Sequence, residues 1–169
     1  MSLPQKTLGR TGYSATRLGL GGEGILRTFG YDRQAQAVIE AALAAGINYF
    51  ETARAYSGSE SYLGRGLKGH RERIFLTSKS HGRTFSEAMA HLSITLKNLD
   101  TDYLDLWQVH DIRTMGEVEA LGLPGGALEA FHHARDRGWV RFIGVTGHHD
   151  PEVLRRALTL YEFDTVLLP

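Results

Sequence analysis

The strongest constraint on the fold is a regular alternation along the chain between short apolar runs, rich in β-branched and aromatic residues, and longer windows with helical periodicity. The apolar runs are continuous, as in strands that are buried on both faces of a sheet. This order predicts βα units and a parallel sheet covered by helices. The expected strands cover residues 16–20, 47–51, 74–78, 103–110, 140–145 and 163–168.

Capping residues mark where the intervening helices should begin and end. Asp32 and Ser86 are expected to cap the first turns of two helices, and Asp150, followed by proline, should open a third. Gly46 and Gly138 stand where a residue of left-handed conformation would end a helix. Each helical window has one apolar face, so each predicted helix can pack on the sheet.

The spacing of the strands indicates the kind of sheet. Successive strand centres lie roughly 25 to 35 residues apart, close to the ~31 residues per unit of a (β/α)8 barrel of ~250 residues. The sequence therefore predicts an α/β TIM-barrel fold, present as an incomplete barrel of about six βα units. Residues 6–8 and 13–15 should form an N-terminal β-hairpin. We expect a single domain over residues 1–169, truncated before strands seven and eight, whose open sheet edges favour self-association.

Composition argues against several classes of function. The chain has 169 residues with 19 Lys and Arg and 19 Asp and Glu, so its formal net charge is zero and nucleic acid is not an expected partner. It contains no cysteine, which excludes disulfides and cysteine-ligated metals from this stretch. No apolar run approaches the roughly 18 residues of a membrane span. We therefore expect a cytoplasmic protein without a membrane partner.

A glycine-rich segment at residues 19–24 formally matches the G-x-G-x-x-G dinucleotide-binding fingerprint. In a Rossmann fold the third glycine opens a helix, whereas the first helix signal here is Asp32. The spacing favours a flexible loop after the first strand, with a Rossmann-type dehydrogenase as the alternative. Because the carboxyl ends of barrel strands face the active site, Gly21 and Gly22 are candidate cofactor-binding residues.

Four ionisable residues leave the predicted sheet at the same end. Glu51 and Tyr56 follow the second expected strand, Lys79 follows the third, and His110 ends the fourth. Each residue type alone has an ordinary interpretation, such as a solvated lysine or a hydrogen-bonded core histidine. Because the carboxyl ends of parallel strands lie at the same end of a barrel, the four residues together predict a catalytic site there.

The chemistry of these four residues fits a proton donor to a carbonyl oxygen. Tyr56 should hold its proton at neutral pH, because the pKa of a phenol is near ~10, and a nearby Lys79 ammonium should lower that pKa. Glu51 is expected to pair with Lys79, and His110 can hydrogen-bond the carbonyl oxygen. The motifs of serine hydrolases, zinc peptidases and P-loop kinases do not occur.

Two histidine pairs, at residues 132–133 and 148–149, raise the question of a metal site. Adjacent side chains on a helix do not face the same way, so neither pair is a good pair of ligands for one ion. We therefore expect no metal.

Four segments resemble the aldo-keto reductase superfamily in order and spacing. They are residues 46–60 (GINYFETARAYSGSE), 75–79 (FLTSK), 102–110 (DYLDLWQVH) and 141–147 (RFIGVTG). The resemblance implies reversible hydride transfer between a nicotinamide and the carbonyl carbon of a small aldehyde or ketone, with Tyr56 as the general acid. It implies NADP(H) as cofactor, with NAD(H) not excluded. A non-catalytic nicotinamide-binding regulatory subunit of the same fold is the alternative.

The resemblance also implies residues for the cofactor. Thr146 and Gly147 occupy the positions where the family usually has a Ser-Asn pair on the nicotinamide carboxamide, so Gly147 supplies no side-chain contact. Leu167 aligns with a glutamine that many members place under the nicotinamide ring. Glu51 stands where the family more often has Asp, with the same charge on a longer side chain.

The substrate itself is not specified by the sequence. Trp107 and Tyr31 are the residues expected in the substrate pocket. The segment at residues 112–123 is expected to be a loop flexible enough to form part of a lid.

Overall fold

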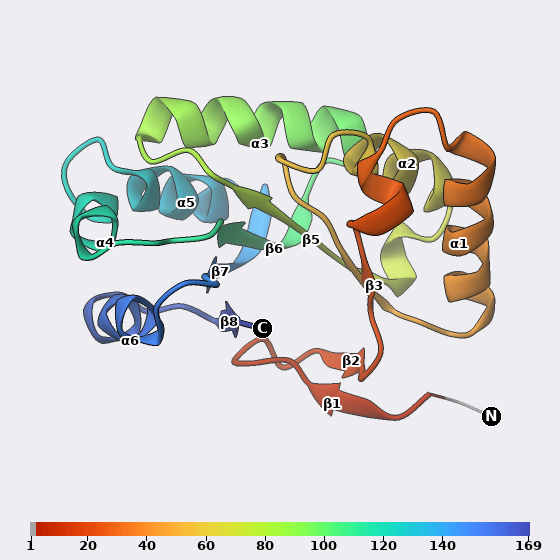
Figure 1. The fold of residues 1–169 in the computed structure, drawn as a ribbon, viewed down its shortest axis with the longest axis horizontal. Helices are drawn as coiled ribbons and strands as arrows, with labels where there is room; N and C mark the ends of the chain where they lie inside the picture. Colours follow the sequence, from red (N-terminus) through yellow and green to blue (C-terminus); the bar gives the residue numbers. More distant parts are fainter. Residues whose placement is uncertain (1–2) are drawn as a thin grey trace.

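The computed structural model describes residues 3–169 as a curled sheet of six parallel strands with helices packed against it (Figure 1). The strands lie in the order of the sequence, so each one pairs with the next along the chain. This arrangement confirms the predicted incomplete (β/α) barrel. The strands are β3 (Leu20–Gly21), β4 (Tyr49–Glu51), β5 (Phe75–Ser80), β6 (Leu104–Val109), β7 (Val140–Thr146) and β8 (Thr165–Leu167).

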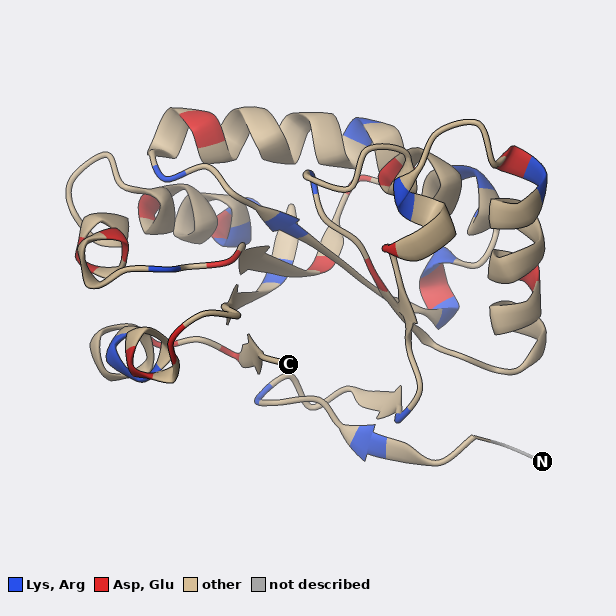
Figure 2. Ribbon diagram, viewed as in Figure 1, with Lys and Arg blue, Asp and Glu red and all other residues tan. Residues whose placement is uncertain are grey.

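Helices follow most of these strands and share a core with them. Phe50, Leu76 and Trp107 come from three neighbouring strands and are fully buried in that core. Basic and acidic residues are interspersed along the helices (Figure 2). The helices are α1 (Asp32–Ala44), α2 (Ser59–Gly66), α3 (Phe85–Leu99), α4 (Met115–Leu121), α5 (Ala127–Asp136) and α6 (Pro151–Leu160), with 3₁₀ turns η1 (Gly24–Arg27) and η2 (Arg71–Arg73).

An aromatic cluster fills the inner face of the sheet near the amino ends of the strands. The ring centroid of Phe75 lies 4.8 Å from that of Tyr13 and 5.9 Å from that of Tyr49. The ring centroid of Phe142, in β7, lies 6.2 Å from that of Phe75. Such contacts add to the area that the rings bury. Because this end of the sheet is packed, a ligand site is expected at the carboxyl ends of the strands.

The predicted N-terminal hairpin is confirmed and contributes to the closure of the packed end. Its strands, β1 (Gln5–Thr7) and β2 (Ser14–Thr16), pair antiparallel. The backbone N–H of Arg10 donates to the carbonyl of Asp164, just before β8, at 2.8 Å. The hairpin thus joins the last described strand to the start of the chain, as Figure 1 shows.

The first expected strand, residues 16–20, has the wrong bounds. Thr16 belongs to β2, where it pairs with Gln5, and the first strand of the sheet contains only Leu20 and Gly21. The backbone N–H of Thr16 donates to the side chain of Asn48 at 2.7 Å. This bond holds Thr16 in the hairpin, outside the parallel sheet.

Two predicted helix starts are also wrong by one or two residues. Asp32 lies in the first turn of α1, and Tyr31 is the N-cap. Thr84, not Ser86, caps α3. The Thr84 hydroxyl accepts from the N–H of Glu87 at 3.3 Å, and the Glu87 carboxylate accepts from the N–H of Thr84 at 3.1 Å. This reciprocal pair satisfies two donors that a cap at Ser86 would leave free.

The remaining cap predictions are confirmed. The Asp150 carboxylate accepts from the N–H of Glu152 at 2.8 Å, and Pro151 is the first residue of α6. Gly46 and Gly138 have φ values of +81° and +75°, a conformation that costs glycine nothing.

Thr84→Ala should lower the free energy of unfolding by about 1 kcal/mol, because it removes the hydroxyl half of the capping box. Urea denaturation checks this value. Ser86→Ala, two residues along the same helix, is the matched control and should change stability by less than about 0.5 kcal/mol. Equal effects of the two changes would argue against the assigned cap.

The Rossmann alternative is wrong. A Rossmann sheet reverses its strand order at a switch point, whereas the order here is β3 to β8 without reversal. The glycine-rich segment leads into the short 3₁₀ turn η1, and α1 begins only at Asp32. The segment at residues 112–123 is also not an irregular loop, because it contains α4, which buries Val118 and Leu121.

Candidate active site

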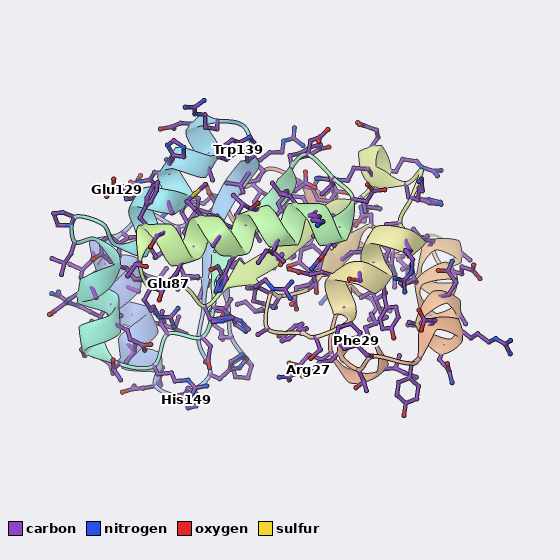
Figure 3. The ribbon with its side chains drawn as sticks, turned by 90° about the horizontal axis from the view of Figure 1, so that it is seen from above. Arg27, Phe29, Glu87, Glu129, Trp139 and His149 are labelled. Atoms are coloured by element: carbon purple, nitrogen blue, oxygen red, sulfur yellow. The ribbon has the colours of Figure 1, made fainter. Side chains whose placement is uncertain are left out.

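The carboxyl ends of the central strands bring the predicted residues to one place. Glu51 ends β4, Lys79 lies near the end of β5, and His110 directly follows β6. Figure 3 shows Arg27 and His149, which follow the carboxyl ends of β3 and β7, along one side of the molecule, and Trp139 on the opposite side. The site therefore lies away from the amino ends of the strands.

Lys79 is the centre of this group and is almost fully buried, with 1% of its surface exposed. Its ammonium donates to the Tyr56 hydroxyl at 3.3 Å and to the Thr52 carbonyl at 3.1 Å. It also forms an ion pair with Glu51. The His110 ring stands edge-on to Tyr56, with centroids 5.7 Å apart. The structure thus brings all four predicted catalytic residues together.

The backbone around Tyr56 is held from two sides. The N–H of Arg54 donates to the Lys79 carbonyl at 3.0 Å, so the turn that carries the phenol is tied to the strand that carries the lysine. Gly22 packs against the end of β4 and the start of α2. A Cβ at residue 22 would lie 2.3 Å from the Ser59 hydroxyl and 2.9 Å from the Glu51 carbonyl. Glycine is required at residue 22 because a side chain there would displace the end of β4.

Burial controls the protonation of Tyr56, and one prediction fails here. Lys79 was expected to lower the pKa of the phenol, but burial raises that pKa to about 12 and the nearby Glu23 carboxylate adds to the rise. Arg27 acts in the opposite direction without overcoming it. Burial also lowers the pKa of the Lys79 ammonium, which weakens its effect on the phenol. Tyr56 is therefore a fully protonated donor at neutral pH.

His110 is neutral at neutral pH. Burial, followed by the charge of Lys79, lowers the pKa of its ring to about 4. A neutral ring donates from one nitrogen and accepts at the other. It can therefore hydrogen-bond an uncharged oxygen next to the Tyr56 hydroxyl without competing for that proton.

The His110 ring should titrate near pH 4 in an NMR titration, far below the ordinary value of 6.5. Since the unfolded chain takes up this proton near pH 6.5 and the folded chain does not, the contribution of His110 should make stability fall from pH 6.5 towards pH 4. His110→Gln should flatten this part of the profile. A ring that titrates near pH 6.5 would contradict the assigned burial.

A cleft of about 560 Å³ opens above Tyr56 and His110. Sequence reasoning missed most of its other residues. Glu23 directly precedes η1 and Arg27 ends it, and the two form an i,i+4 ion pair that the sequence could have revealed. Arg83 and Arg113 follow β5 and β6, the strands that carry Lys79 and lead to His110. The residues around the cleft are Glu23, Arg27, Ala55, Tyr56, His81, Arg83, His110, Asp111, Arg113, Glu117 and His148.

The candidate cofactor residues lie at the same end of the sheet, in two groups. Gly21 lines a second hollow of about 470 Å³ together with Glu51 and Leu167, and most of the other residues of this hollow come from the N-terminal hairpin and the segment that leads to β3. A Cβ on Gly21 would meet nothing within 4 Å, so this part of the hollow is open. Thr146 is buried, and its hydroxyl accepts from the N–H of Asp111 at 2.7 Å, which orders the turn after His110.

Gly147 lines neither the cleft nor the second hollow but a third hollow of about 380 Å³, together with His148 and Leu154. Its N–H donates to the Leu167 carbonyl at 3.3 Å. A Cβ at residue 147 would lie 3.1 Å from the Leu154 side chain, so the chain approaches α6 closely there.

The two residues predicted for the substrate pocket do not line the cleft. Trp107 is fully buried and stacks on Phe131 of α5, with ring centroids 3.8 Å apart. Tyr31 is 42% exposed at the start of α1, where its N–H donates to the Tyr62 hydroxyl at 3.0 Å. Trp107 points to the helix layer because side chains alternate along β6, which places it on the face opposite to His110.

Residues 3–169 hold no cluster of three or more His, Cys, Asp or Glu side chains that could bind a metal ion. No helix among them is long and apolar enough to cross a membrane.

The sequence is similar to proteins of one family over most of its length. The model of the Aldo/keto reductase family matches residues 17–168. L-galactose dehydrogenase of Arabidopsis thaliana is 32% identical over 155 residues, which cover 84% of this chain and 48% of that protein. An aldo-keto reductase of Bacillus subtilis is 33% identical over 153 residues, with coverage of 80% and 44%. The chain thus spans about half the length of these curated relatives.

Solved structures show the same fold over nearly all of the chain. A putative aldo-keto reductase from Pseudomonas aeruginosa superposes with a TM-score of 0.82 at 28% identity, covering 99% of this chain and 68% of that one. An aldo-keto reductase from Klebsiella pneumoniae, solved in complex with NADPH, gives a TM-score of 0.76 at 24% identity, covering 94% and 54%.

Proposed function

The chain belongs to the aldo/keto reductase family, and we propose that it carries an NAD(P)H-dependent oxidoreductase site that interconverts carbonyl compounds and alcohols. The observation that carries this proposal is the contact of Lys79 with both Glu51 and the Tyr56 hydroxyl, 3.3 Å from the ammonium. These residues come from two separate strand ends and meet beside a cleft that His110 also lines. Family membership supports the same assignment.

A nicotinamide would supply the hydride, and Gly21 and Glu51, at the carboxyl ends of β3 and β4, would lie beside it. His110, neutral at pH 7, would hold the carbonyl oxygen by a hydrogen bond. Tyr56 would donate its proton to that oxygen as negative charge develops on it, because an alkoxide is a much stronger base than a phenolate. Lys79 would then stabilise the phenolate from 3.3 Å, with Glu51 fixing its position.

The test is multiple-turnover oxidation of NADPH by the purified chain with a panel of aldehydes and quinones, with NADH alongside. Turnover that depends on the carbonyl compound is the expected result. Binding of NADPH without turnover would favour the non-catalytic, cofactor-binding alternative. Absence of both binding and turnover in the folded chain would contradict the proposal.

Self-association is a separate and independent proposal. The outer strand β8 exposes Val166, and Leu168 follows it with 58% of its surface exposed. An open edge with apolar side chains can pair with another strand. Sedimentation velocity should therefore show a dimer or larger species, and Val166→Lys should shift the distribution towards monomer. A monomer at all concentrations would overturn this proposal.

A further inference from the structure

A second cation, besides Lys79, lies over the ring of Tyr56. The guanidinium carbon of Arg27 is 5.3 Å from the centroid of the phenol ring, within the range of a cation–π contact. The Lys79 ammonium is 4.6 Å from the same centroid. Arg27 ends η1 and lines the cleft together with Tyr56. The phenol therefore has cations beside it from two different elements, β5 and η1.

The position of Arg27 is fixed at its backbone and at its side chain. Its carbonyl accepts from the N–H of Gly58, two residues after Tyr56, at 3.3 Å. Leu26, the preceding residue, is buried in the core. The guanidinium is paired with the Glu23 carboxylate at 3.1 Å. These contacts hold the cation next to the Tyr56 ring, although half of the Arg27 side chain is exposed.

Lys79 and Arg27 differ in how firmly they keep their charge. Burial lowers the pKa of the Lys79 ammonium to about 7, although its ion pair with Glu51 favours the charged form. A guanidinium stays protonated below a pH of about 12, and that of Arg27 is half exposed to water. At and above neutral pH, Arg27 is therefore the more permanent of the two positive charges.

Glu23 and Arg27 act on the phenol in opposite directions. Burial contributes most to the raised pKa of Tyr56, the Glu23 carboxylate adds to the rise, and Arg27 opposes it. An opposite charge favours the charged form of a group and a like charge disfavours it. Glu23 thus favours the protonated phenol, whereas Arg27 favours the phenolate that remains after a proton has left.

The other titratable groups around Tyr56 are paired or neutral. The ion pairs are Lys79–Glu51, Arg113–Asp111 at 2.6 Å and Arg83–Glu117 at 3.2 Å. The rings of His110 and His81 carry no charge at neutral pH, because burial lowers the pKa of each. His148, which follows β7, is the remaining titratable residue of the cleft. Replacing Glu23 or Arg27 therefore changes one charge beside Tyr56 and leaves these pairs intact.

We propose that Arg27 is a positioning residue for the proton transfer, because its guanidinium stabilises the phenolate form of Tyr56, and that Glu23 holds the guanidinium against the ring. The proton leaves the Tyr56 oxygen for the oxygen of the former carbonyl group, and solvent later returns a proton to the phenolate. The proposal rests on the proposed function and adds two residues from the segment around η1 to the same site.

A titration of residue 56 tests the assignment without turnover. The chain is made with a tyrosine fluorinated at both ortho carbons in place of Tyr56, because this phenol ionises at a lower pH, and its fluorine NMR signal is followed. Arg27→Met should raise the pKa of this phenol and Glu23→Gln should lower it, each by about 0.5–1 pH unit, since both side chains are half exposed. Changes in the same direction, or none with Arg27→Met, would overturn the proposal.

Arg65→Met and Asp32→Asn are the matched controls. Arg65 lies over the ring of Tyr62 at 5.2 Å and pairs with Asp32 at 2.8 Å, so these residues repeat the geometry of Arg27, Tyr56 and Glu23. They do not line the cleft. Neither change should move the titration of residue 56. A shift as large as that of Arg27→Met would trace the effect to the net charge of the chain and contradict the proposal.

Kinetics connect the charge with the reaction. Arg27→Met should lower kcat for carbonyl reduction about 3- to 10-fold and leave KM for NADPH unchanged, because the phenolate forms only in the chemical step. Arg27→Lys keeps a positive charge and should recover most of this loss. A kcat that Arg27→Met leaves unchanged would overturn the proposal. If the unmodified chain reduces no aldehyde, the proposed function fails, whereas opposite changes at residue 56 would still support stabilisation of the phenolate by Arg27.

Discussion

Tyr56→Phe should lower kcat by about 100- to 10,000-fold, the range that a positioned general acid contributes. The change removes only the hydroxyl that accepts from Lys79 at 3.3 Å and keeps the ring that faces His110. Affinity for NADPH, measured from the fluorescence of the cofactor, should therefore survive. A loss of kcat with retained binding identifies the hydroxyl with the chemical step.

Tyr103→Phe is the matched control for this experiment. Tyr103 lies just before β6, at the opposite end of that strand from His110, where its ring packs on Arg71. Its loss should leave kcat within about twofold, since it touches none of the reacting groups. Equal kcat values for Tyr56→Phe and the unmodified chain would exclude Tyr56 as the proton donor.

Glu60→Leu should lower the free energy of unfolding by about 3–5 kcal/mol, the usual cost of breaking a buried ion pair. Only 1% of the Glu60 surface is exposed. Its carboxylate is paired with Arg54 and accepts hydrogen bonds from Ser78 at 3.1 Å, Thr95 at 2.6 Å and Asn98 at 3.1 Å. The change leaves a partly buried guanidinium and three donors without an acceptor, and urea denaturation measures the loss.

Glu119→Leu provides the comparison for Glu60→Leu. Glu119 has 64% of its side chain exposed and lies 3.9 Å from Arg156, so its loss should change stability by less than about 0.5 kcal/mol. Equal effects of the two changes would show that the buried carboxylate does not hold α2, α3 and β5 together.

The periodicity of apolar residues was sufficient to predict the fold. The residues that follow the predicted strands were sufficient to predict which side chains lie together at the candidate site. Glu51, Lys79 and His110 could be placed together because consecutive parallel strands deliver their carboxyl ends to one edge. The predicted bounds of a helix and of a strand were wrong where a single side-chain hydrogen bond determines which residue begins or ends the element. Thr84 began α3 two residues earlier than Ser86 because of its capping box. Thr16 lies in the hairpin because its backbone N–H donates a hydrogen bond to the side chain of Asn48.

Other features depend on contacts between distant segments. The rise in the Tyr56 pKa requires its burial and the approach of Glu23, 33 positions earlier in the sequence. Nη1 of Arg83 and Oδ1 of Asp111 are buried without a hydrogen-bond partner among residues 3–169, and this too is a property of the folded chain. Trp107, by contrast, could have been placed correctly from the sequence. It stands in β6, three positions before His110, which directly follows that strand, and residues an odd number apart along extended chain face opposite sides.

Transfer of deuterium from NADPH tests the central claim most directly. The purified chain is incubated with NADPH carrying deuterium at C4 of the nicotinamide, on each face in turn, and with glyceraldehyde. Mass spectrometry should find one deuterium on the former carbonyl carbon of the alcohol, from one face of the nicotinamide only, and Tyr56→Phe should suppress its appearance. Alcohol that forms without deuterium from either face, or transfer undiminished in Tyr56→Phe, would contradict this claim.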